Sequence, residues 1–212
     1  MNFVAHAHIA LLYEPAAGGE HAFGAVMPDL AAMAGCRLDR SLLAPALRDG
    51  VALHHRTDSA FHALPAFHEG VGAIREALLA AGVPAGPARA VGHAGYELLL
   101  DGCLLANAGV VEEFAGVLEC APDGGVAIPP ASRDRWRQLL GSMRDERWWL
   151  GYRDPELVAR GLQRRLQARA RLRLTSDRLP AVTAVLSAAQ AGVETACDQV
   201  VAAVAAALRS RS

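Results

Sequence analysis

The sequence predicts an all-α protein, a single-domain helical bundle. Hydrophobic residues make up 52% of the 212 residues and aromatic residues only 5%, because alanine, leucine and valine predominate. Such a composition packs helices well and favours strands poorly. Apolar residues recur three and four positions apart along the chain, and no convincing stretch alternates with period two. A chain of this length can form one large domain, so we expect a single domain over residues 1–212.

Caps, prolines and glycines set the expected helix boundaries in the first half. Asn2 can cap a first helix that runs to about Glu14 and ends at the Pro-Ala-Ala-Gly-Gly run. A second, short helix is expected around residues 27–33. Proline suits the first turn of a helix and glycine suits the position after its end. The other helices expected in this half are 41–63, 65–82, 87–107 and 110–120.

A glycine- and proline-rich loop at residues 122–130 is the one candidate subdivision of the domain. Helices are expected to resume at 132–143, 155–174 and 179–208. The last of these is apolar and long enough to raise the question of a membrane span. Polar residues recur along it at helical spacing, however, which favours an amphipathic helix of a soluble protein. We therefore expect no membrane partner.

All 21 basic residues are arginine, and they are unevenly distributed. Residues 1–130 carry 6 arginines and 14 acidic residues, whereas residues 131–180 carry 13 arginines and 6 acidic residues. The absence of lysine excludes a Walker phosphate loop and Schiff-base chemistry. A basic segment beside an acidic half suggests an anionic partner, although the arginine-rich run at 160–178 also fits a solvated helix face.

The four cysteines are widely spaced and form no Cys-x-x-Cys pair. They are Cys36, Cys103, Cys120 and Cys197. This pattern favours small buried side chains in a reducing compartment over a redox or zinc-binding role. We therefore expect a cytoplasmic protein.

Histidine and carboxylate residues form two stripes whose successive members are four residues apart and so share one helix face. The stripes are His54, Asp58 and His62 on the third expected helix, and His93, Glu97 and Asp101 on the fifth. Apolar residues surround the second stripe, and a buried carboxylate requires a cationic partner. Because lysine is absent, a divalent transition metal is the simplest partner. Each stripe alone also fits a hydrogen-bonded core histidine or a solvated helix edge.

Five segments resemble the bacterial acyl carrier protein phosphodiesterases, a family regarded as a divergent branch of the metal-dependent HD phosphohydrolases. The segments are residues 1–8 (Met-Asn-Phe-Val-Ala-His-Ala-His), 24–29, 50–58 (Gly-Val-Ala-Leu-His-His-Arg-Thr-Asp), 149–154 and 169–172. They occur in the family's order and span most of the chain. His93 and Glu97 stand where the family has two aspartates four residues apart, His62 stands in place of another acid, and Ala25 in place of an asparagine.

The resemblance implies an HD-domain-like helical fold and a metal-dependent activity. The ion would be manganese, with iron or magnesium as alternatives. With the two stripes, it suggests the metal ligands His6, Asp29, His54, Asp58, His93 and Glu97. The implied reaction hydrolyses a phosphodiester, removing the phosphopantetheine group from holo-acyl carrier protein and leaving a serine hydroxyl.

Three further residues are candidates for catalysis. The planar guanidinium of Arg56 suits a non-bridging phosphate oxygen, although a structural salt bridge is equally compatible with its position. His8 or His55 would transfer a proton to the leaving oxygen. Acyl carrier proteins are acidic, so the arginines of residues 160–178 would contact that partner. Nucleic acid is not expected.

Two other classes of function stay open at this point. Some HD-type helical sites hold two irons and activate dioxygen, so a di-iron oxygenase is one alternative. A metal-binding structural or interaction protein is the other. Within the hydrolases, the replacement of the family's aspartates also fits a different small phosphate ester.

Overall fold

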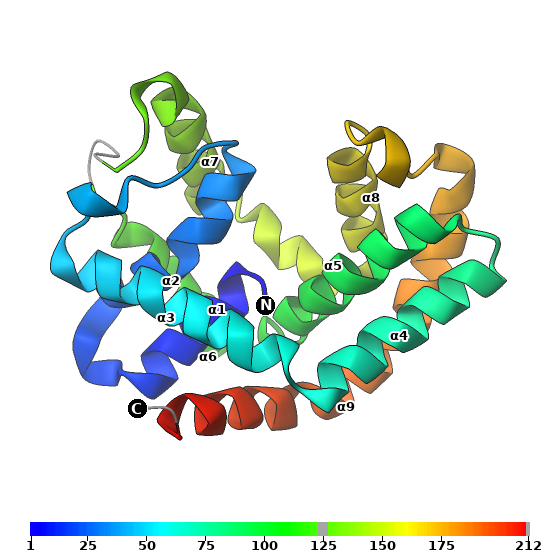
Figure 1. Ribbon diagram of the computed structural model, residues 1–212, viewed down its shortest axis with the longest axis horizontal. Helices are drawn as coiled ribbons and strands as arrows, with labels where there is room; N and C mark the ends of the chain where they lie inside the picture. The colour runs from blue at the N-terminus through cyan, green and yellow to red at the C-terminus, as the bar shows by residue number, and fades with distance from the viewer. Residues whose placement is uncertain (123–126, 211–212) are drawn as a thin grey trace. The chain divides into compact units, whose positions relative to one another are not determined.

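The computed structural model describes residues 1–122 and 127–210, and the regular secondary structure of this part of the chain is entirely helical (Figure 1). The predicted all-α class is therefore confirmed. The chain forms two compact units, of which the first comprises residues 1–61, 107–149 and 201–212 and the second residues 62–106 and 150–200. The loop at 122–130 lies within the first unit, and its residues 123–126 fall outside the described ranges.

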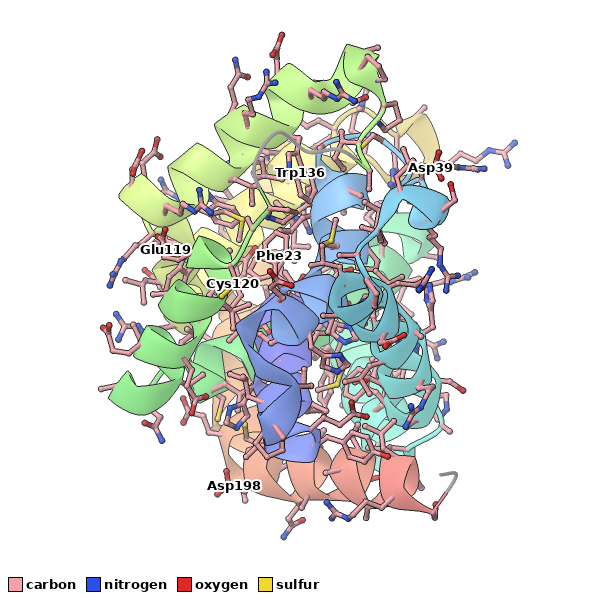
Figure 2. The ribbon with its side chains drawn as sticks, turned by 90° about the vertical axis from the view of Figure 1, so that its left-hand side faces the viewer. Phe23, Asp39, Glu119, Cys120, Trp136 and Asp198 are labelled. Carbon is pink, nitrogen blue, oxygen red and sulfur yellow. The ribbon has the colours of Figure 1, made fainter. Side chains whose placement is uncertain are left out.

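The first unit has an aromatic core. Its helices are α1 (Phe3–Tyr13), α2 (Gly18–Met33), α3 (Pro45–His62, of which His62 belongs to the second unit), α6 (Ala108–Glu119), α7 (Arg133–Asp145) and the end of α9 (Leu179–Arg209). Phe3 stacks on Phe114 with 5.6 Å between ring centroids, and Phe114 meets Trp149 edge to face at 4.9 Å. Phe23 of α2 meets Trp136 of α7 in the same way at 6.4 Å (Figure 2). Packing of α1 against both α2 and α6 places α1 inside this core.

The second unit is built around a helical hairpin. Its helices are α4 (Pro65–Ala80), α5 (Ala85–Leu104), α8 (Pro155–Leu166) and the first part of α9. Helices α4 and α5 lie side by side (Figure 1), and α5 also packs against α8. Gly82 follows α4 and has a φ of 76°, a conformation that favours glycine. This conformation is typical of the residue that ends a helix, which is the role predicted for Gly82.

Three expected helices differ from the structure by four or more residues at one end. The second begins at Gly18, well before its expected start, because Phe23 and neighbouring apolar residues are buried and outweigh the low helix propensity of glycine. The third begins at Pro45, after a separate 3-10 turn. The helix from Pro155 ends at Leu166 rather than near residue 174, so the arginine-rich segment is only partly helical.

Helix α9 resembles a membrane span in length and composition. An 18-residue window within Ala170–Arg209 has a mean hydropathy of 1.3, and 39% of that window is buried inside the structure. Core helices of soluble proteins share these properties, so this helix alone does not assign the protein to a membrane.

Candidate metal centre

Three of the predicted ligands, His6, His54 and Asp58, meet in the first unit. Nε2 of His6 lies 3.2 Å from Asp58 Oδ1, and Nε2 of His54 lies 3.6 Å from Asp58 Oδ2. One donor atom from each residue lies within 4.8 Å of the other two. We call these residues the first triad. His6 comes from α1, and the other two come from one face of α3.

The position of His6 follows from the character of its helix. Helix α1 is apolar on nearly all sides, which is typical of a core helix, and it is buried against α2 and α6. His6 is therefore only 1% exposed. A polar side chain held in such a core has few orientations, so the position of the His6 imidazole is well defined.

The position of His54 depends on a close crossing of α2 and α3. A Cβ atom at Gly50 would clash with the carbonyl oxygen of His21, and one at Gly24 would clash with that of Leu47. Only glycine at both positions permits the two backbones to approach so closely. Gly50 lies one turn before His54 on the same helix face, so this crossing brings the His54 imidazole against α2.

The imidazole of His54 is oriented by the backbone of α2. Its Nδ1 donates a hydrogen bond to the carbonyl oxygen of Ala25 at 2.9 Å, because a carbonyl oxygen can only accept. In the neutral ring Nε2 then carries the lone pair, and Nε2 is the atom that faces Asp58. A metal-ligating histidine typically makes this outer hydrogen bond, which fixes its tautomer and its orientation.

The electrostatics of His54 and Asp58 favour the protonation states in which these two residues bind metal. Burial, followed by the charge of the neighbouring His6, lowers the pKa of His54 from 6.5 to about 3, and the two rings stack with 3.9 Å between centroids. Burial acts to raise the pKa of Asp58, but the hydrogen bond from His6 and the Met1 ammonium, 2.9 Å away, hold that pKa well below its usual range. At pH 7 a neutral imidazole therefore faces an ionised carboxylate, as metal binding requires.

A second group, formed by His62, His93 and Glu97, lies in the second unit. Nε2 of His62 and Nε2 of His93 are each 3.2 Å from Glu97 Oε1, and one donor atom per residue lies within 4.8 Å of the others. We call these residues the second triad. Burial acts to raise the pKa of Glu97, but hydrogen bonds from His62 and His93 lower it well below its usual range, so the carboxylate is ionised.

The second triad includes a residue that the predicted ligand set omitted. His62 was not among the expected ligands, yet it occupies the third position of the His54–Asp58–His62 stripe, and this spacing is the signal that marks it. His54 and Asp58 belong to one unit and His93 and Glu97 to the other. The expectation that one ion is shared by all the predicted ligands therefore stays a prediction.

Two polar residues of α2 lie outside both triads. Asp29 is half-buried, one turn beyond the Ala25 carbonyl that orients His54. His21 is buried, with its Nε2 3.5 Å from a carboxylate oxygen of Glu14. The sequence did not single out His21, because no acid or histidine stands three or four residues after it.

The three candidate catalytic residues occupy different surroundings. His55 is exposed and its ring lies edge-on to His54 with 5.2 Å between centroids, so it borders the first triad. Arg56 donates to the hydroxyl of Tyr13 at 3.0 Å, and its guanidinium lies over the Tyr13 ring. Nδ1 of His8 lies 3.0 Å from a carboxylate oxygen of Glu113.

The arginine-rich segment lies at the surface. Its exposed members are Arg160, Arg164, Arg165, Arg169, Arg171 and Arg173, whereas Arg178 is half-buried. Arg160 pairs with Glu156, and Arg178 pairs with Asp177. The segment offers exposed positive charge from α8 and from the turns that follow it.

The second unit also contains an apolar cavity of about 740 Å³ between α4 and the first part of α9. Alanine side chains from both helices line most of it, and Glu69 and Tyr96 are its main polar residues. This lining offers no cationic group to an anionic substrate, so the cavity is not the expected phosphodiester site.

Comparison with known protein families, with curated proteins and with solved structures gives no match to this chain.

Proposed function

We propose that this protein is a metal-dependent phosphodiester hydrolase whose divalent ion is bound by the first triad. The observation that carries the proposal is the convergence of His6, His54 and Asp58, with Nε2 of His54 directed at the carboxylate by its outer hydrogen bond. Among the other predicted ligands, Asp29 on the neighbouring helix α2 is the candidate for a fourth.

The donor set fits a divalent ion. Bonds of about 2.0–2.2 Å to nitrogen and oxygen place neighbouring ligand atoms about 3.0–3.5 Å apart. In the first triad the distance from His6 Nε2 to Asp58 Oδ1, 3.2 Å, lies within this range, and that from His54 Nε2 to Asp58 Oδ2, 3.6 Å, lies just beyond it. Three protein ligands also leave coordination positions for water and substrate, as in catalytic rather than structural sites.

The chemistry divides between the ion and the chain. A bound ion would supply Lewis acidity, which lowers the pKa of a water molecule and offsets the charge that develops on phosphorus. Asp58 holds negative charge at the site, and Ala25 keeps the Nε2 lone pair of His54 available. His55, exposed beside the triad, would move a proton to the leaving oxygen. Arg56 would release the hydroxyl of Tyr13 and bind a phosphate oxygen instead.

The proposed metal and substrate rest on the family resemblance, on the ligand types and on surface charge. Mn(II) is the ion that the family resemblance favours, with iron as the alternative. Two imidazoles argue against magnesium, which prefers oxygen ligands. Holo-acyl carrier protein is the proposed substrate, because the exposed arginines of 160–178 suit an acidic partner, and another small phosphate ester is the alternative. The four cysteines are free thiols, in keeping with a cytoplasmic location.

A second candidate function is an iron-dependent oxygenase. Two histidines and one carboxylate with open positions are also the donor set of non-haem Fe(II) oxygenases. Dioxygen consumption by the iron-loaded protein, without phosphodiester hydrolysis under any divalent metal, would favour this candidate over the hydrolase.

Hydrolysis of a small chromogenic phosphodiester with added Mn(II) tests the proposal. Asp58→Ala should reduce the rate at least about 100-fold, because loss of a ligand exceeds the effect of losing an outer-shell partner. Asp49→Ala is the matched control, since Asp49 is an exposed aspartate of the same helix and lies outside both triads. Full activity of Asp58→Ala, or no hydrolysis by the wild-type protein with Mn(II) or Fe(II), would overturn the proposed function.

A further inference from the structure

We propose that the second triad is a metal site in its own right and binds a borderline divalent ion such as Zn(II). The residues are His62, His93 and Glu97, all in the second unit. This site is distinct from the proposed hydrolytic centre in residues and in unit, and it does not depend on the reaction assigned to that centre.

The geometry of the second triad matches a coordination sphere. Both Nε2 atoms lie 3.2 Å from the same Glu97 oxygen. An ion with bonds of about 2.0–2.2 Å requires ligand atoms about 3.0–3.5 Å apart, so only small side-chain adjustments are needed. His93 and Glu97 are one turn apart on α5, which is the spacing at which two helical side chains bind one ion.

The triad is held by regular elements and by an aromatic wall. The ring of Phe67, in the first turn of α4, meets the His62 and His93 rings at centroid distances of 4.7 and 5.2 Å. This contact restricts rotation of both imidazoles and keeps their Nε2 atoms directed at Glu97. Ligands fixed by packing in this way bind metal with little ordering cost.

The site is open to solvent on one side. The Glu97 side chain is 16% exposed, whereas that of His93 is 49% exposed and that of His62 is 35% exposed. The carboxylate therefore lies at the base of the site and the imidazoles at its rim. An ion can reach the triad from solution and retain water in its remaining coordination positions.

The ligand types select the class of ion. Two imidazoles and one carboxylate favour zinc, iron, cobalt or nickel over the oxygen-preferring ions magnesium and calcium. A hydrogen-bonded cluster without metal would use the same Nε2 atoms as proton donors to one oxygen. Metal binding and such a cluster are therefore mutually exclusive uses of the same atoms, and titration with an ion distinguishes them.

Calorimetric titration of the metal-free full-length protein with Zn(II) tests the proposal. His93→Ala and Glu97→Gln should each weaken this zinc site at least about 100-fold, while the helical circular dichroism is retained because His93 lies at the surface. His68→Ala is the matched control, since His68 is exposed and its ring also contacts Phe67, yet it lies outside the triad. This control should bind zinc as the wild-type protein does.

Asp58→Ala separates this site from the first triad. The proposal is supported if Asp58→Ala still binds zinc and His93→Ala does not, whatever the first triad binds. Equal zinc stoichiometry and affinity in wild type, His93→Ala and Glu97→Gln would overturn the proposal. A single zinc that Asp58→Ala and His93→Ala both abolish would also overturn it, because one shared site would then use both sets of residues.

Discussion

His54 illustrates how one backbone contact can fix the orientation and the tautomer of a buried side chain. Its Nδ1–H donates a hydrogen bond to the Ala25 carbonyl oxygen. The lone pair of the neutral ring therefore lies on Nε2, which faces Asp58. The spacing of histidines and acids predicts which residues can be ligands. The Ala25 hydrogen bond could not be predicted, because any residue supplies a carbonyl oxygen and only the tertiary fold selects one. The hydrogen bond from Arg56 to Tyr13 could not be predicted for the same reason.

We expect the metal-free protein to lose stability because of His54 as the pH falls from about 6.5 toward 3. The unfolded imidazole takes up a proton near pH 6.5, whereas the buried one does so only near its pKa of about 3. The unfolded state therefore binds more protons in this window, and the free energy of unfolding decreases as the pH falls, by up to about 1.4 kcal/mol per pH unit.

Urea unfolding of the wild-type protein and of His54→Gln at several pH values in this window measures the effect. His54→Gln lacks the titrating group, so its free energy of unfolding should depend less steeply on pH. Parallel pH dependences for the two proteins would show that His54 is not the group responsible.

At the scale of elements, glycine spacing determines where α2 and α3 meet. The sequence predicts α3 and its stripe, because proline and periodicity mark the helix. The early start of α2 was missed, because glycines at its beginning indicate a loop by propensity alone. Gly24 and Gly50, by contrast, permit the close approach of α2 and α3. Only the packed structure reveals this approach.

We expect Gly50→Ala to weaken both the fold and the first triad. The new methyl group would meet backbone atoms of His21 and Ala25, so α3 must shift away from α2. Overpacking of this kind costs about 1–3 kcal/mol, and the displaced His54 should bind Mn(II) at least about tenfold more weakly. Urea unfolding and a Mn(II) titration measure the two effects.

Gly116→Ala provides the matched control. Gly116 lies within α6 of the same unit, and a Cβ there would meet nothing within 4 Å. Because alanine is the better helix former, this variant should be as stable as wild type or more stable by up to about 1 kcal/mol. If both variants had the same stability and Mn(II) affinity, the close crossing would not be what positions His54.

At the scale of the whole molecule, the sequence predicts the helical class but not the division into two units. Each unit combines segments that are distant in sequence, and α9 contributes to both units. No linker composition marks such a division, because its boundaries fall at 61/62, 106/107, 149/150 and 200/201, within or beside helices. The spacing predicts two faces that carry histidines and carboxylates, but the sorting of their residues into two triads depends on which unit each residue joins.

Charge is the whole-molecule property that relates to the proposed substrate. Complementary charge mainly raises the rate of encounter, and salt screens it. If the exposed arginines contact an acidic carrier protein, turnover at subsaturating holo-acyl carrier protein should fall steeply as salt is added. Charge reversal at Arg164 and Arg165 should lower it similarly. Hydrolysis of a small phosphodiester, measured in parallel, should change little, and equal salt sensitivity of the two substrates would contradict docking through these arginines.

Anomalous X-ray diffraction from crystals grown with Mn(II) tests the first triad most directly, because it locates the ion without reference to activity. We predict a manganese peak about 2.0–2.3 Å from Nε2 of His6, Nε2 of His54 and a carboxylate oxygen of Asp58. The Nδ1 hydrogen bond from His54 to Ala25 should persist in that structure. An empty first triad at saturating Mn(II), or manganese bound only elsewhere on the chain, would contradict the assignment of these three residues as the metal centre.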